Sequence, residues 1–218
     1  RRSLKRLSRR AARRCSALRF PFENQKRRVR VHAFRMQRTE VSRRAYQACV
    51  QAKACRQVPA RFRAPGKGNL PMVGVTWAEA RSYCRWRGGD LPTERQWVAA
   101  ARGDTMPPRL WPWGRHAVRG CARILAPKVA SIGPVGGQPC DASAFGVLGL
   151  AGNVREWVRR SSVKAGATTR IARGGSFRQA EWWSRAATRW RIAAGSRVDD
   201  VGLRCVGVRE SGRSAKGR

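Results

Sequence analysis

The stretch that decides the fold is residues 171–206, IARGGSFRQAEWWSRAATRWRIAAGSRVDDVGLRCV. Its first residues predict a strand that breaks at Gly174-Gly175, and a second strand is expected to end at Cys205. Three tryptophans and several arginines lie between the two strands. Strand backbone needs hydrogen-bonding partners and Cys205 needs a mate, so earlier parts of the chain must supply both. We expect any activity of the protein to be decided in this stretch.

The length of 218 residues, 42% of them hydrophobic, suits one large domain or two small ones. We expect an ordered domain at 34–208, a basic arm without fixed structure at 1–33 and a polar tail at 209–218. The arm lacks the continuous apolar segment of a complete signal peptide. No apolar run approaches the ~18 residues of a transmembrane helix, so no membrane span is expected.

The formal net charge of +36 favours anionic partners. Residues 1–33 hold thirteen basic residues and one acid, whereas the later basic residues are scattered among aromatics and glycines. Such a distribution indicates weak, nonspecific binding of anions. A basic nucleic-acid-binding protein stays an alternative, and the steep salt dependence of its DNA affinity would reveal it.

Seven cysteines without a CxxC motif indicate disulfides rather than a zinc site, and the two histidines, His32 and His116, give little support to histidine catalysis. Cys15 in the arm is the seventh cysteine and is expected to have no disulfide partner. Three disulfides are expected among Cys49, Cys55, Cys84, Cys121, Cys140 and Cys205. The predicted location is therefore extracytoplasmic, either periplasmic or secreted.

Local spacing suggests two cysteine pairs. Cys49 and Cys55 are six residues apart and can close a small loop at the end of a helix, and a Cys121–Cys140 bond would tie down the irregular segment 115–144.

Helix boundaries can be read from the capping residues. Ser42 can cap a helix that turns Tyr46 and Cys49 inward, and the sequences TWAE at 76–79 and TERQ at 93–96 are capping boxes. Short strands are expected at 31–36 and 71–75. Short strands, capped helices and long irregular loops stapled by disulfides define an α+β domain.

The segment FGVLGLAGNVREW, residues 145–157, offers hard oxygen ligands. Asn153 and Glu156 lie three residues apart beside glycine-rich backbone, and Ca²⁺ prefers carboxylate, carboxamide and carbonyl oxygens. An asparagine after glycine is more often simply part of a turn.

Five stretches occur in one order, namely PMVGVTWAEARSYCRWRGGDLPTERQWVAAARG, WPWG, FGVLGLAGNVREWV, RGGSF and DDVGLRC. Together they resemble the formylglycine-generating enzyme family, also called the sulfatase-modifying factor family, over residues 34–208. The resemblance implies a variant of the C-type lectin-like fold with little regular secondary structure. A composition rich in arginine and tryptophan is typical of family members from high-GC bacteria.

The resemblance also implies that Cys84 pairs with Cys205, and Cys49–Cys55 and Cys121–Cys140 then follow by proximity and exclusion. It implies calcium held by Asn153, Val154 and Glu156 together with backbone carbonyls. A further calcium site of the family needs an acid in the region that corresponds to residues 121–137, which here contain none. We therefore do not carry that second site over.

Enzymes of the resembled family oxidise a sulfatase cysteine with O₂ and copper(I), which two cysteines bind just after Gly-Gly-Ser. Ser176 matches the family serine, but Gln179 and Ser184 stand at the two cysteine positions. Copper(I) requires soft thiolate ligands, so neither copper nor its oxidase chemistry is expected. A sister branch uses iron held by histidines, which this motif region lacks.

The sequence therefore favours a pseudoenzyme, that is, a non-catalytic binding or scaffold module with a protein, peptide or glycan partner. Tryptophan and arginine dominate interface hot spots. The predicted binding surface consists of Phe177, Trp182, Trp183, Arg185, Arg189, Trp190 and Arg191. For the adjacent Trp182 and Trp183, at least one partly exposed ring is expected. The alternative is an enzyme of the family with altered chemistry, acting through Ser176, Gln179 or Arg189.

Overall fold

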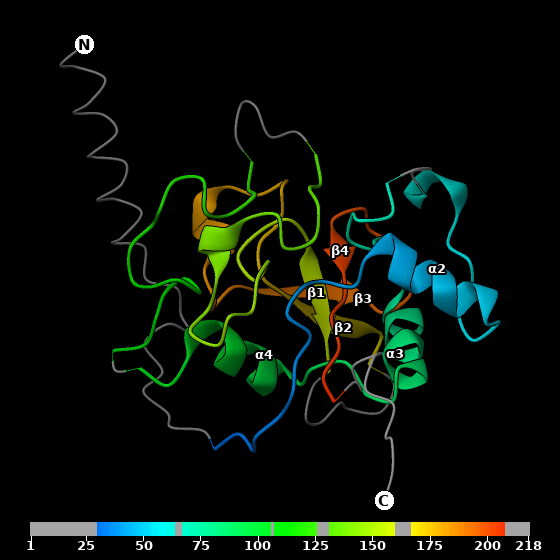
Figure 1. Cartoon of the computed structure of the whole chain (residues 1–218), viewed down its shortest axis with the longest axis horizontal. Helices are drawn as coiled ribbons and strands as arrows, with labels where there is room; N and C mark the ends of the chain where they lie inside the picture. The colour runs from blue at the N-terminus through cyan, green and yellow to red at the C-terminus, as the bar shows by residue number, and fades with distance from the viewer. Residues whose placement is uncertain (1–29, 64–66, 106, 126–130, 160–166, 208–218) are drawn as a thin grey trace, which may run out of the picture. The chain divides into compact units, whose positions relative to one another are not determined.

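The computed structural model describes residues 30–63, 67–105, 107–125, 131–159 and 167–207 (Figure 1). The predicted tail at 209–218, and the arm up to residue 29 with Cys15, lie outside this part of the chain. The α-helices are α2 (Arg43–Gln51), α3 (Trp77–Trp86) and α4 (Glu94–Arg102). The strands are β1 (Arg155–Val158), β2 (Thr169–Arg173), β3 (Arg189–Ala193) and β4 (Val201–Gly202). Three short 3₁₀ turns are η1 (Ala60–Phe62), η2 (Pro139–Asp141) and η3 (Glu181–Ser184).

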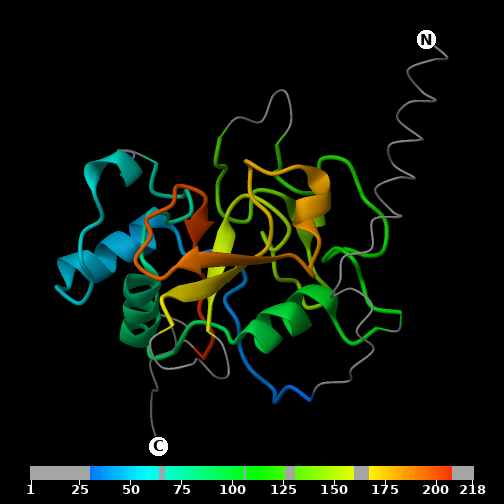
Figure 2. The same cartoon turned by 180° about the vertical axis from the view of Figure 1, so that it is seen from behind.

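The four strands form one mixed sheet in the order β3-β2-β1-β4. β1 pairs with β2 and β2 with β3 in antiparallel fashion, whereas β1 and β4 are parallel. Seen from behind, β3 runs beside β2 across the sheet (Figure 2). Residues 171–206 thus supply β3, β4 and most of β2. The FGVLGLAGNVREW segment supplies the remaining partner strand, β1.

The predicted break after the first strand is confirmed. β2 ends at Arg173, and Gly174 has a φ of +84°, a conformation that favours glycine. The second predicted strand is shorter than expected, because β4 covers only Val201–Gly202. Beyond it, Val206 forms isolated bridges with Met36 and Asp90.

The helix boundaries follow the capping residues. Ser42 Oγ accepts a hydrogen bond from the Ala45 amide at 3.2 Å, and complete capping boxes open α3 at Thr76 and α4 at Thr93. Gly103, with a φ of +69°, follows the last residue of α4. Each cap satisfies amides that a helix cannot pair internally, which is why these predictions are confirmed.

The two predicted strands at 31–36 and 71–75 are not regular strands. Met36 and Pro71 form only single bridges, to Val206 and Ser42 respectively. The chain after Met36 nevertheless follows the closing stretch, because the Gln37 amide donates to the Cys205 carbonyl at 3.0 Å. Single bonds of this kind fix the path of a segment without a continuous ladder.

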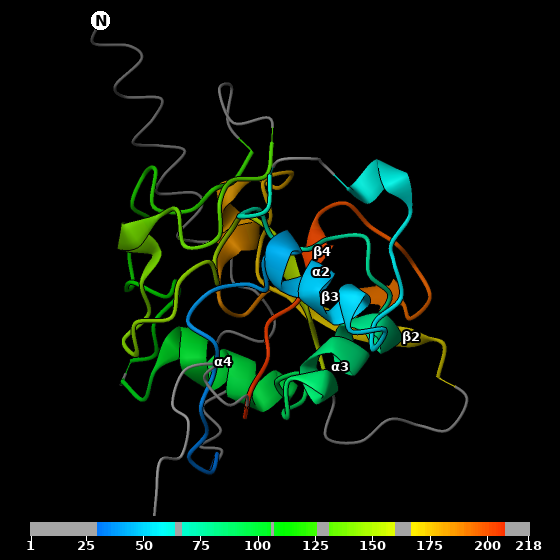
Figure 3. The same ribbon diagram turned by 45° about the vertical axis from the view of Figure 1, so that its right-hand side comes forward.

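The core lies between the helices and the sheet. The rings of Tyr46 from α2 and Tyr83 from α3 stack with their centroids 5.6 Å apart, in a core cluster that also contains the buried Trp157 of β1. A second cluster gathers Trp97 of α4 with Val158 and other buried residues. Figure 3 shows α2 over α3, with α4 to the left of both. Trp157 and Val158 are neighbours on β1 but belong to different clusters, so β1 lies between two apolar layers.

All three predicted disulfides are present: Cys49–Cys55, Cys84–Cys205 and Cys121–Cys140. The Cys84–Cys205 bond ties α3 to the closing stretch across 121 residues of sequence. The α+β, disulfide-stapled architecture is therefore as expected. In the described part of the chain, no helix combines the length and apolar character needed to cross a membrane.

Candidate functional site

The position that resembles the copper site lies directly after Gly174-Gly175. Ser176 is fully buried, and its Oγ lies 2.6 Å from Asp200 Oδ2 and 2.9 Å from Gln179 Oε1. Asp200 is also buried and forms an ion pair with Arg155. The serine and glutamine are thus parts of a hydrogen-bonded network that ends in a neutralised carboxylate.

The second ligand position is filled in the same way. Ser184 is fully buried, and its Oγ accepts from Trp111 Nε1 at 3.1 Å while donating to the carbonyl of Glu181. Gly175 allows this packing, because a Cβ there would lie 2.9 Å from Ser184 Cα. Ser184 and Gln179 therefore place a hydroxyl and an amide at the two positions where a soft metal ion would need thiolates.

The predicted surface of tryptophan and arginine residues contains both exposed and buried members. Trp182 and Trp183 are each 37% exposed, so the expectation of an exposed ring in this pair is confirmed. Phe177 and Arg185 are 7% and 1% exposed, and therefore belong to the interior rather than to a binding surface. Both residues lie between β2 and β3, outside any strand, so no alternation of side chains was available from which the sequence could predict their burial.

The three remaining residues of that surface lie on β3. Arg189 forms an ion pair with Glu94, and the Trp190 indole donates to the Gly174 carbonyl at 3.0 Å. Arg191 is exposed. Because side chains alternate along a strand, Arg191 and Trp190 project to opposite faces of the sheet. The seven predicted residues therefore do not form one surface, and the exposed aromatic part is Trp182 with Trp183.

The Asn153 side chain is fixed inside the loop before β1. Its Oδ1 accepts from the Gly133 amide at 2.9 Å, and its Nδ2 donates to Glu40 Oε1 at 2.9 Å. Asn153 has a φ of +64°, which asparagine tolerates better than most residues. The adjacent Val154 is a buried core residue.

Glu156 points into a different environment. Arg204 donates to both of its carboxylate oxygens at 2.7 Å, and the Trp97 indole donates to Oε2 at 2.7 Å. Both members of the Glu156–Arg204 pair are at most 1% exposed. Arg204 also donates to the carbonyls of Gln37, Arg38 and Leu148. The oxygens of Glu156 are therefore committed to a guanidinium, and Asn153 and Glu156 do not converge on a common ligand.

These contacts do not fit the calcium site that the family motif implies at Asn153, Val154 and Glu156. A cation at Glu156 would compete with Arg204 at both carboxylate oxygens, and like charges repel in a buried site. Sequence reasoning assigned no role to Arg204, because it lies 48 residues from Glu156 and no local motif indicates that the two side chains pair.

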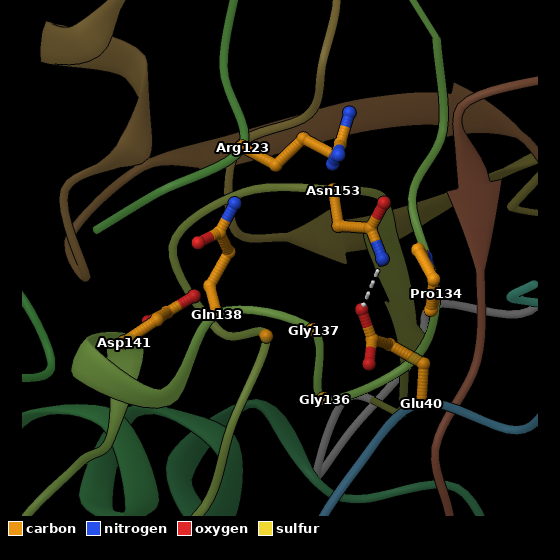
Figure 4. A pocket seen from close by; sticks show the side chains of 9 residues that line it. Glu40, Arg123, Pro134, Gly136, Gly137, Gln138, Asp141 and Asn153 are labelled. Carbon is orange, nitrogen blue, oxygen red and sulfur yellow. Dashed lines mark hydrogen bonds between the residues drawn. The ribbon is translucent and has the colours of Figure 1, made fainter. Parts of the chain in front are cut away.

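A small pocket of about 20 Å³ adjoins Asn153 (Figure 4). Sequence reasoning missed its two acids, Glu40 and Asp141, which are 2% and 1% exposed. Burial raises the pKa of Glu40 to about 7 and raises the pKa of Asp141 well above its usual value. The pocket is lined by Glu40, Arg123, Pro134, Gly136, Gly137, Gln138, Asp141, Gly149 and Asn153.

The fold and the altered Gly-Gly-Ser site together define a protein built on the scaffold of formylglycine-generating enzymes. A model of the sulfatase-modifying factor enzyme 1-like domain matches residues 9–209, and the chain belongs to this family. The structure of PvdO from Pseudomonas aeruginosa superposes with a TM-score of 0.65 at 21% identity, covering 79% of each chain. That likeness shows the fold alone.

Two mouse proteins are similar in sequence. Inactive C-alpha-formylglycine-generating enzyme 2 is 34% identical over 160 residues, covering 65% of this chain and 52% of that protein. Formylglycine-generating enzyme is 31% identical over 166 residues, covering 64% and 44%. The chain thus spans about half the length of these relatives.

Proposed function

We propose that this protein is a non-catalytic member of the family, a binding or scaffold module that does not oxidise cysteine with copper. The observation that supports it most is the state of the two ligand positions. Gln179 and the buried Ser184 are both engaged in hydrogen bonds, and neither carries a thiolate. The similarity to an inactive mouse family member agrees with this proposal.

The exposed pair Trp182 and Trp183 is the part of the surface best suited to a partner. Each ring is 37% exposed beside a buried framework, and Trp183 lies 5.0 Å from Trp190 between ring centroids. Large aromatic rings held by neighbours contribute contact area at a low cost in conformational entropy. We assign to this surface a protein, peptide or glycan ligand.

Three disulfides in the described domain favour an extracytoplasmic location, where such bonds form and persist. The proposed module would then act in the periplasm or outside the cell.

The protein is expected to produce no formylglycine from a cysteine-containing sulfatase peptide in the presence of Cu(I) and O₂, and to bind no Cu(I) at this site. The matched variant is Gln179→Cys/Ser184→Cys, which places two thiols at the ligand positions and is expected to acquire Cu(I) binding. Mass spectrometry of the peptide and a competition assay for Cu(I) measure the two results. Formylglycine formed by the unmodified protein would contradict the proposal.

A further inference from the structure

The segment of the chain around α2 and η1 is basic and contains no acid. Residues 41–78 hold seven arginines and lysines without an aspartate or glutamate, whereas residues 79–125 hold nine bases and four acids. We call residues 43–67 the basic lobe. Its bases are Arg43, Arg44, Lys53, Arg56, Arg61, Arg63 and Lys67, and all except Arg43 are exposed. Positive charge is therefore concentrated in this lobe without local compensation.

No acid in the described ranges pairs with the bases of the lobe. The ion pairs between described residues use only Arg81 and arginines that follow it in the chain. Arg61 instead lies over the ring of Phe62, 4.8 Å from its centroid, in a cation–π contact that keeps the positive charge. Exposed charges of one sign attract partners of the opposite sign. The basic lobe is therefore suited to an anionic partner.

The lobe is held together by contacts within it and with the loop that follows. The Cys49–Cys55 disulfide closes the turn after α2, and the Tyr46 hydroxyl donates to the Arg56 carbonyl at 3.1 Å. The Arg44 amide donates to the Gly68 carbonyl at 2.9 Å. In Figures 1 and 2, the blue α2 and the cyan η1 lie together on one side of the sheet. A frame fixed in this way lowers the entropy lost when a partner binds.

The side chains of the lobe favour a layer of lipid headgroups over other anionic partners. In the described ranges, none of the large exposed apolar side chains belongs to the lobe. Protein interfaces need an apolar centre, and single-stranded nucleic acids stack on aromatic rings, whereas anionic headgroups attract a basic surface by charge alone. Duplex nucleic acid also needs only charge. The three disulfides favour the extracytoplasmic side, where membrane surfaces rather than nucleic acids are the usual polyanions.

We propose that the basic lobe docks on the anionic headgroups of a membrane surface, without inserting into the bilayer. This surface is separate from the Trp182 and Trp183 pair, so docking leaves that pair available for the partner of the proposed binding module. Only the choice of lipid over nucleic acid rests on the extracytoplasmic location proposed above.

The test sediments the full, oxidised chain with vesicles of phosphatidylglycerol and phosphatidylcholine, and with vesicles of phosphatidylcholine alone. We expect binding to the first kind only, and weaker binding as the salt concentration rises. The variant Lys53→Gln/Arg56→Gln/Arg63→Gln/Lys67→Gln should bind at least about twentyfold more weakly. Each base at an anionic surface contributes a factor of about five, and the estimate assumes that two of the four make contact.

The matched control is Arg35→Gln/Arg95→Gln/Arg119→Gln/Arg191→Gln, which removes four exposed bases outside the lobe. It should lose less than about fivefold, the effect of a single contact, and near-UV circular dichroism verifies that both variants are folded.

Three outcomes would overturn the proposal. The first is that the unmodified chain does not sediment with the phosphatidylglycerol vesicles, and the second is an equal loss of binding in the two variants. The third is that duplex DNA, at the same phosphate concentration, captures the chain more strongly than the vesicles and through the same four residues. The substituted positions lie outside the Gly-Gly-Ser site, so none of these outcomes bears on the absence of copper chemistry.

Discussion

Arg204→Met is expected to lower the free energy of unfolding by about 3–5 kcal/mol, the cost of leaving a buried charge without its partner. Arg204 is fully buried and donates to both oxygens of Glu156 and to three backbone carbonyls. Methionine fills part of the volume but supplies none of these donors. Glu156 would keep only the Trp97 indole as a donor among the described side chains.

Urea unfolding of the oxidised protein, followed by tryptophan fluorescence, measures this change. Arg178→Met is the control, because the Arg178–Asp199 pair is 54% and 48% exposed. Exposed pairs contribute little, so this variant should stay within about 1 kcal/mol of the unmodified protein. Equal losses in the two variants would mean that the burial of the Glu156–Arg204 pair has no energetic consequence.

Loss of the Cys84–Cys205 disulfide should produce a destabilisation of similar size. Replacing both cysteines by alanine opens a loop of 121 residues, and the loop-entropy model assigns about 5 kcal/mol to such a crosslink. The bond also joins α3 to the segment that carries Arg204 and Val206. We therefore expect the Cys84→Ala/Cys205→Ala variant to have the lowest melting temperature of the three paired-cysteine variants.

The matched comparison is Cys49→Ala/Cys55→Ala, which removes a bond across only six residues. The same model gives about 2 kcal/mol for this short loop. Thermal unfolding of both variants under identical conditions measures the difference. If the short-loop variant melted at the lower temperature, loop closure would not explain how these disulfides stabilise the fold.

Features encoded by neighbouring residues could be predicted from the sequence. The helix starts at Ser42, Thr76 and Thr93 depend on hydrogen bonds within a single turn, and the strand break depends on Gly174 itself. The family motifs added the Cys84–Cys205 pairing, which no local spacing could have shown.

Features created by tertiary contact could not be predicted. Glu156 offered two ligand oxygens in the sequence, but Arg204 reaches them from 48 residues away. Likewise, Glu40 and Asp141 are separated in sequence by α2, α3 and α4 and line the same pocket only in the folded chain. The predicted surface from Phe177 to Arg191 does not form one unit, because the burial of Phe177 and Arg185 between β2 and β3 and the alternation of side chains along β3 depend on tertiary packing.

The double bridge at Val206 has a consequence for the timing of folding. Val206 pairs with Met36 near the start of the described domain and with Asp90 after α3, and Cys205 makes its disulfide beside them. A ribosome releases residues in order, so these contacts cannot form until nearly the whole domain has been synthesised. Contacts of such long sequence separation slow folding. The nascent polypeptide should therefore remain incompletely folded until its last strand emerges from the ribosome. Until then it depends on protection from aggregation.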